Sequence, residues 1–260
     1  VSTGFSGPDD SAIRVEDCAD VVMSGTTARG EDGSDLGGLV HGVLAEDSSL
    51  HAYGCTFVGG RAYSDGGGAA SSSDGGYGLF VIGPQGFAML SDCTIVGGDN
   101  DCTVLGFTLC LGNPGYGIVG SQAQIHVLDS TIQAGAPAST PFCTCSRPDE
   151  LGSVQHLAGE SLRLRTSAPT REGQTLTYTI EGPANVPVWL ATSLRSNAQY
   201  LPQFRGSSLI GLPALTVRLA GTTDGSGALQ TTQTVPSILS GASGIRLFVQ
   251  PYYTSPVVLG

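Results

Sequence analysis

The sequence contains no lysine, so all 11 of its basic residues are arginine, and they face 22 acidic residues. The formal net charge of −11 argues against a nucleic-acid partner, because proteins that bind nucleic acids neutralise the phosphates with basic side chains. No apolar run approaches the ~20 residues of a membrane-spanning helix, so we expect no membrane span. No signal-peptide pattern opens the chain, which suggests a mature or trimmed form. Long helical periodicity is also missing, and 39 glycines favour an all-β fold.

The acidic residues are concentrated in the first half of the chain. Residues 1–150 hold 18 acids and 4 arginines, a net charge of −14, whereas residues 151–260 hold 4 acids and 7 arginines, a net charge of +3. Oppositely charged halves favour head-to-tail contact between copies. The alternative is an ordinary soluble surface.

One short motif recurs at a nearly fixed period. Ser91-Asp92-Cys93-Thr94-Ile95-Val96-Gly97-Gly98 is echoed at 54–60 and at 129–135, with a fainter copy at Asp17-Cys18. The cysteine or serine of the motif recurs at offsets of 37, 38 and 37 residues. Such a period indicates a repeat architecture.

Each copy reads as two strands joined by a sharp corner. Apolar or small residues alternate with exposed ones, as in a strand, and the alternation then skips one residue. The residue at the skip is Gly54, Asp92 or Asp129, with Asp17 as the proposed fourth. Glycine and aspartate tolerate the left-handed backbone region that a corner requires.

This pattern, over about residues 10–140, resembles right-handed parallel β-helix proteins, the superfamily that includes pectate lyases. The alternative fold is a β-sandwich with similar hairpins. The resemblance implies four columns of residues inside the coil, namely Leu50, Ala88 and Ile125; Ala52, Leu90 and Val127; Cys55, Cys93 and Ser130; and Phe57, Ile95 and Ile132. In the first coil Asp20 would stand where Phe57 places an apolar ring, so that coil looks irregular.

Each coil also has an earlier strand, at 38–40, 76–81 and 115–119. The segments 25–37, 61–75 and 99–114 between coils are rich in Gly, Ser and Asp, so we expect loops that leave from one corner and form one face.

Seven cysteines suggest an extracytoplasmic protein with at least one disulfide. Cys102 and Cys110 flank a short apolar loop and are the disulfide candidates. Cys55 and Cys93 are either buried thiols or a bridge between coils, and Cys143 and Cys145 lie too close together to bridge to each other.

After the repeats, a second series of segments with alternating apolar and polar residues follows. The sequence therefore predicts a β-helix domain at 1–140, a linker at 141–152 and a β-sandwich domain at 153–260. Strand patterns at 161–165, 175–180, 215–219 and 245–249 are separated by turn signals. Val188-Trp189-Leu190 is the predicted core. The stretches 172–177, 182–183, 187–190 and 247–250 resemble C-terminal β-sandwich modules of large secreted bacterial proteins, which implies secretion or surface display without catalysis.

Candidate chemistry lies in the loops of the first half. Loop acids could bind calcium beside Arg29 and Arg61, as in a lyase, but no lyase motif is present; these acids are Asp32, Asp35, Asp65, Asp74, Asp99 and Asp101. The run 30–35 has oxygen-rich spacing, which makes Asp32 and Asp35 weak calcium candidates. His51 and His126 share an outward register, but Met89 lies on the coil between them, so we do not expect them to share a metal ion. No nucleophile elbow is present, and no other cofactor is expected.

The sequence therefore favours an extracellular structural or adhesive protein of a bacterial surface that self-associates end to end into filaments. The short apolar finish 257–259 could add to a neighbour's sheet. The alternative is a β-helix that binds or cleaves carbohydrate, with surface glycans as partners.

Overall fold

The computed structural model describes residues 9–32, 39–62, 74–100, 113–137, 146–167, 171–201, 206–211, 216–235, 247–254 and 257–259. The chain divides into two compact units, Val1–His156 and Leu157–Gly260, and each is described by itself. All regular elements within the described ranges are β-strands, so the expected all-β class is confirmed.

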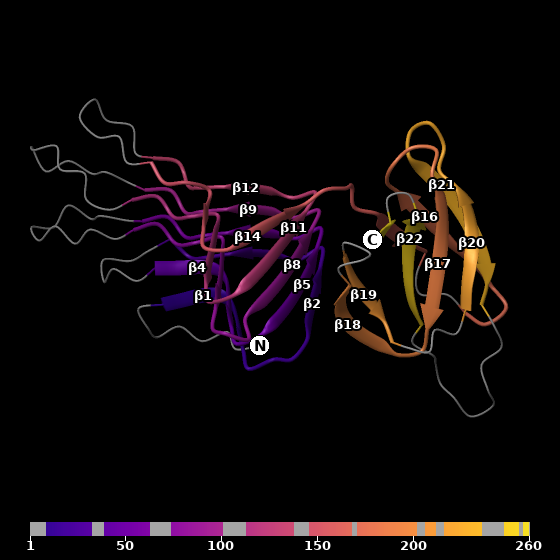
Figure 1. Cartoon of the computed structure of the whole chain (residues 1–260), viewed down its shortest axis with the longest axis horizontal. Helices are drawn as coiled ribbons and strands as arrows, with labels where there is room; N and C mark the ends of the chain where they lie inside the picture. Colours follow the sequence, from indigo (N-terminus) through magenta and orange to yellow (C-terminus); the bar gives the residue numbers. More distant parts are fainter. Residues whose placement is uncertain are drawn as a thin grey trace, which may run out of the picture. The chain divides into compact units, whose positions relative to one another are not determined.

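The first unit consists of three parallel sheets whose strands interleave in sequence, so that each coil adds one strand to each sheet (Figure 1). The first sheet contains β1 (Asp9–Glu16), β4 (Leu39–Glu46), β7 (Leu79–Ile82), β10 (Ile118–Ser121) and β13 (Glu150–Leu151). The second contains β2 (Val21–Ser24), β5 (Ser49–Tyr53), β8 (Phe87–Ser91), β11 (Gln124–Leu128) and β14 (Val154–Leu157). The third contains β3 (Thr27–Arg29), β6 (Thr56–Val58), β9 (Thr94–Val96) and β12 (Thr131–Gln133). The β-helix coils expected from the repeat are therefore present.

The core of this unit lies inside the coils, where equivalent residues stack. Leu50 pairs with Ala88, Ala52 with Leu90 and Phe57 with Ile95, as in-register neighbours. The predicted core residues that are buried in this cluster are Leu50, Ala52, Cys55, Phe57, Ala88, Leu90, Cys93, Ile95, Ile125 and Val127. Ile132 is partly buried against it.

The corners adopt the left-handed backbone that the sequence suggested. Gly54, Asp92 and Asp129 have φ values of 56°, 54° and 46°. The fainter copy at Asp17-Cys18 was assigned to the wrong corner: Ser49 N donates to Cys18 O, and Asp17 stands level with Asp47 at the turn between the first and second sheets.

The first coil is regular, so the expected irregularity at Asp20 is wrong. The equivalent of Gly54 is Gly25, whose φ is 58° and whose N–H donates to Tyr53 O. Ala28 pairs with Phe57 and is buried, so an apolar side chain does fill that register. The offset of 37 residues led to the wrong corner for Asp17-Cys18, because both corners of a coil need a residue with left-handed backbone followed by a small polar residue.

The second unit consists of antiparallel sheets. One sheet has the order β15 (Arg163–Thr166), β16 (Thr175–Glu181) and β21 (Ala228–Thr234). Another has the order β20 (Thr216–Thr222), β17 (Pro187–Ser193), β22 (Phe248–Thr254) and β23 (Val257–Leu259). A third pairs β18 (Ser196–Leu201) with β19 (Gly206–Ile210).

One expectation about the second unit needs correction, and another stays a prediction. Val188 and Leu190 are fully buried, but Trp189 is only half-buried, because successive side chains of a strand point to opposite faces. The terminal strand β23 pairs with β22 and is the edge strand of its sheet, so the pairing of 257–259 with a neighbour's sheet stays a prediction.

The boundary between the units also lies later than the predicted linker at 141–152. β13 pairs with β10, and β14 is next to β11, so residues 150–156 continue the coil sheets.

Candidate functional site

The chain leaves and re-enters the coils on one side, through segments that we call the arm bundle (Figure 1). The outgoing segments follow the third sheet, at 30–32, 59–62, 97–100 and 134–137. The returning segments precede strands of the first sheet, at 74–78, 113–117 and 146–149. The insertions expected to form one face thus have a common base, but the first of them, expected as a loop over 25–37, contains the strand β3.

A ladder of backbone hydrogen bonds joins outgoing and returning segments alternately. The N–H of each residue donates to the carbonyl of the one before it, at 2.7–2.9 Å, in the series Val40, Gly60, Gly76, Gly98, Gly115 and Gly135. A Cβ built on Gly98 would lie 1.9 Å from Gly60 O, so the backbones are too close for any side chain. Glycine is required here for close approach.

Charged side chains tie the same segments together along one register. Asp32 Oδ1 accepts from Arg61 N at 3.0 Å, and the Arg61 guanidinium lies 3.5 Å from Asp99 Oδ2. Asp99 Oδ1 accepts from Ala136 N at 2.8 Å on the next coil. Acid, base and acid therefore follow one another along the stack, and each acid accepts a hydrogen bond from a backbone N–H group of the next coil.

A second cluster fastens the returning segments. Arg147 Nη2 donates to Asp74 Oδ2 at 2.6 Å, and its guanidinium lies 4.8 Å from the ring centre of Tyr116. Tyr116 contacts Tyr77 edge to face, and Tyr77 stacks on buried His41 at 4.7 Å between ring centres. Burial raises the pKa of Tyr77, which the nearby Arg147 charge opposes.

These contacts account for the loop acids that the structure describes. Asp32, Asp74 and Asp99 all accept backbone hydrogen bonds from another arm segment, whereas Asp35, Asp65 and Asp101 lie outside the described residues. No group of three His, Cys, Asp or Glu side chains with metal-binding spacing occurs within the described ranges. Asp32 also lies 3.7 Å from the Arg29 guanidinium, a cation that competes with calcium.

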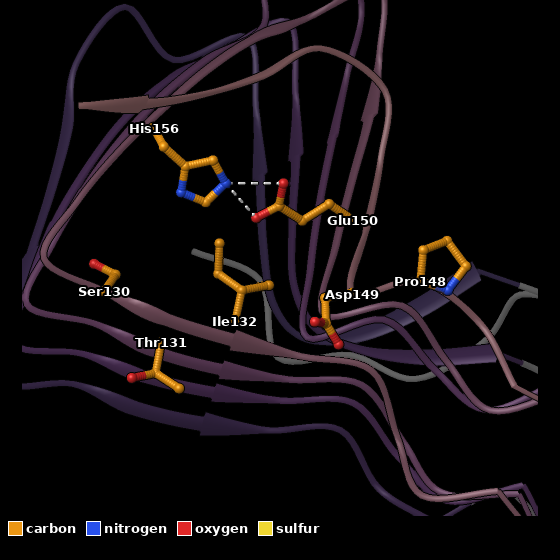
Figure 2. A pocket seen from close by; sticks show the side chains of 7 residues that line it. All are labelled: Ser130, Thr131, Ile132, Pro148, Asp149, Glu150 and His156. Carbon is orange, nitrogen blue, oxygen red and sulfur yellow. Dashed lines mark hydrogen bonds and ion pairs between the residues drawn. The ribbon is translucent and has the colours of Figure 1, made fainter. Parts of the chain in front are cut away.

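A shallow depression of about 670 Å³ lies on the last coil (Figure 2). Nε2 of His156 lies 2.8 and 3.1 Å from the two carboxylate oxygens of Glu150. Ser130 is nearby, but its hydroxyl donates to Leu128 O at 2.8 Å and accepts from Cys93 N at 2.9 Å. The serine, histidine and acid are therefore not arranged as a nucleophilic triad, which needs the serine hydroxyl bonded to the histidine.

The two outward histidines do not form a shared site. His51 and Met89 are both buried, and Met89 separates His51 from His126 in the register. Phe87 lies 5.6 Å from each histidine ring. Burial lowers the pKa of both histidines, so both favour the neutral form.

Sorted by position, the cysteines fall into two groups. Cys18, Cys55 and Cys93 are described and carry free thiols. The disulfide candidates Cys102 and Cys110, and also Cys143 and Cys145, lie outside the described residues, so that pairing stays a prediction.

No protein-family model matches the chain, and no curated protein matches it either. The fold thus defines a β-helix-like protein with a C-terminal region of antiparallel sheets. Within the described ranges, no helix is long and apolar enough to cross a membrane.

Proposed function

We propose that the protein is an extracellular structural or adhesive protein of a bacterial surface, in which the coils are a rigid base for a row of loops. The arm bundle carries this proposal, because its backbone ladder joins segments from successive coils into one unit. The outgoing segments 59–62, 97–100 and 134–137 and the returning segments 74–78, 113–117 and 146–149 come from successive coils, so the bundle places equivalent parts of successive coils side by side. Binding residues are often placed on loops held by a rigid scaffold.

The use of charge in the bundle supports structure over catalysis. A catalytic carboxyl must be able to reach a substrate, whereas Asp32 and Asp99 each accept a backbone hydrogen bond from a neighbouring arm segment, and Asp99 also pairs with Arg61.

The ends of the coil stack support end-to-end association. Within the described residues, β1, β2 and β3 lie at one edge of the three sheets and β13, β14 and β12 at the other. Such edges carry backbone groups that can pair with another chain. Val22 on β2 and Leu151 on β13 are 49% and 47% exposed, so each end also presents an apolar side chain.

The test is light scattering across a concentration series, with electron microscopy for filaments. We expect mass to rise with concentration for the wild type and to fall in Val22→Lys and Leu151→Lys, because lysine on an edge strand opposes pairing. Val217→Lys is the matched control, since Val217 is equally exposed, at 52%, but lies in the second unit. A strictly monomeric wild type, or equal loss in all three variants, would refute end-to-end assembly.

The alternative, a β-helix that binds or cleaves carbohydrate, has weaker support. Sugars bind on open aromatic faces, whereas Tyr77 stacks on His41 and Tyr116 lies against Arg147. Binding of purified surface polysaccharides that is lost in Tyr116→Ala would reverse this preference.

A further inference from the structure

The interior of the coils contains a column of small polar side chains, one for each coil. It consists of Thr26, Cys55, Cys93 and Ser130. Each follows the left-handed residue of its corner, and each donates to the carbonyl two residues earlier. The two middle members are thiols on adjacent coils, 1% and 2% exposed.

The two thiols are in register and close together. Thr94 N donates to Cys55 O at 2.8 Å, so Cys55 stands level with Cys93 in the ladder. Adjacent strands lie about 4.8 Å apart, which is within the Cα–Cα range of disulfides, about 4.4–6.8 Å. Cys93 leans toward the coil of Cys55, because its Sγ lies 3.5 Å from Ala52 O.

We propose that Cys55 and Cys93 form a coil-to-coil disulfide when the protein folds in the presence of a low-molecular-weight disulfide. A bond here would close a loop of residues 55–93, which includes the arm segments 59–62 and 74–78. Closing a long loop restricts the unfolded chain and so stabilises the folded one.

The reaction is a two-step thiol–disulfide exchange. The Cys55 thiolate attacks one sulfur of the small disulfide and expels one thiolate, which gives a mixed disulfide. Cys93 then loses its proton, attacks the Cys55 sulfur and expels the second small thiolate. Two protein thiols are thereby oxidised to one disulfide, and one small disulfide is reduced to two thiols.

The environment divides the roles between the two sulfurs. The hydrogen bond from Cys93 lowers the pKa of Cys55, and the same hydrogen bond, together with burial, raises the pKa of Cys93. Cys55 is therefore the better first nucleophile, since the thiolate is the reactive form.

The experiment is to refold the full chain with oxidised and reduced glutathione, block free thiols with iodoacetamide in denaturant, and digest without reduction. Cleavage before aspartate releases 47–64 and 92–98, each with one cysteine. We expect a cross-linked pair of these peptides, two hydrogens lighter than their sum. We also expect the Tm of the refolded, oxidised protein to fall by several degrees when dithiothreitol is added.

The matched control is Cys93→Ser, which places in the third coil the side chain that the fourth coil has at Ser130. We expect its Cys55 to be alkylated, and its Tm to fall less on addition of dithiothreitol than the Tm of the wild type, since the Cys55–Cys93 bond cannot form in it. The proposal is overturned if the wild type yields both peptides alkylated, or if either cysteine is bonded to a different one.

Discussion

Replacing Gly98 by alanine should break the arm bundle. The new Cβ would lie 1.9 Å from Gly60 O and 2.6 Å from Gly60 C, both backbone atoms that cannot rotate away. The outgoing and returning segments must separate, which disrupts the bonds from Gly98 N to Gly76 O and from Gly115 N to Gly98 O. Each bond contributes about 1 kcal/mol, and each buried group left without a partner costs about 1–3 kcal/mol more. We expect a loss of about 3–5 kcal/mol.

Two other glycines provide graded controls. Gly25→Ala should cost about 1–2 kcal/mol, because its Cβ meets nothing within 4 Å but φ is 58°. Gly225→Ala should change stability by less than about 0.5 kcal/mol, since its Cβ also meets nothing and its φ is not left-handed.

The assay is thermal unfolding followed by two signals. The only tryptophan, Trp189, reports the second unit, and far-UV circular dichroism also reports the coils. For units of this size about 1 kcal/mol shifts Tm by roughly 2–4 °C. We expect Gly98→Ala to lower the coil transition by roughly 10 °C while the tryptophan transition is unchanged. A shift no larger than that of Gly25→Ala would show that the close approach at Gly98 does not stabilise the fold.

Two further predictions concern charge. Arg147→Ala should lower stability by about 1–3 kcal/mol in urea unfolding, because it removes a half-buried pair with Asp74 and a contact with a tyrosine ring. Arg165→Ala, which removes an exposed pair at 3.9 Å, should cost less than about 0.5 kcal/mol, and equal losses would contradict this. Because burial holds the pKa of His51 and His126 below the unfolded value of about 6.5, stability should be complete above that pH and decrease as pH falls through 6.5 toward 5. The double His→Gln variant should have a flatter profile over this window, and an unchanged slope would count against the assignment.

The coil core could be predicted from sequence because it depends on local alternation. Leu50, Ala52 and Phe57 each have an equivalent at the same offset in the next coil, and in-register stacking buries them together. The first coil could not be placed from the motif alone. Asp17-Cys18 and Asp92-Cys93 have the same chemistry at different corners, and only the pairing of strands separates them.

The sequence analysis does not predict the arm bundle, because its ladder is formed by backbone groups of glycines, and glycine-rich segments are also typical of loops. A signal was nevertheless present. Equivalent triplets stand directly after the last strand of each coil. They are Gly30-Glu31-Asp32, Gly59-Gly60-Arg61, Gly97-Gly98-Asp99 and Ala134-Gly135-Ala136. Small residues at fixed positions in every coil indicate close backbone approach as well as flexibility.

The same alignment explains which side chains can repeat from coil to coil. In-register stacking places equivalent side chains about 4.8 Å apart, so each position must tolerate its own kind as a neighbour. Hydroxyls and thiols do so readily, whereas two carboxylates at this spacing repel unless solvent screens them or a cation lies beside them, as Arg14 does beside the in-register Glu16 and Glu46. The stack places Arg61 between Asp32 and Asp99, where its guanidinium pairs with Asp99 and its backbone N–H donates to Asp32, which also pairs with Arg29. An acid, an arginine and an acid at one register of successive coils, as at Asp32, Arg61 and Asp99, thus indicate stacked segments, whereas acids gathered for calcium would lack the arginine between them.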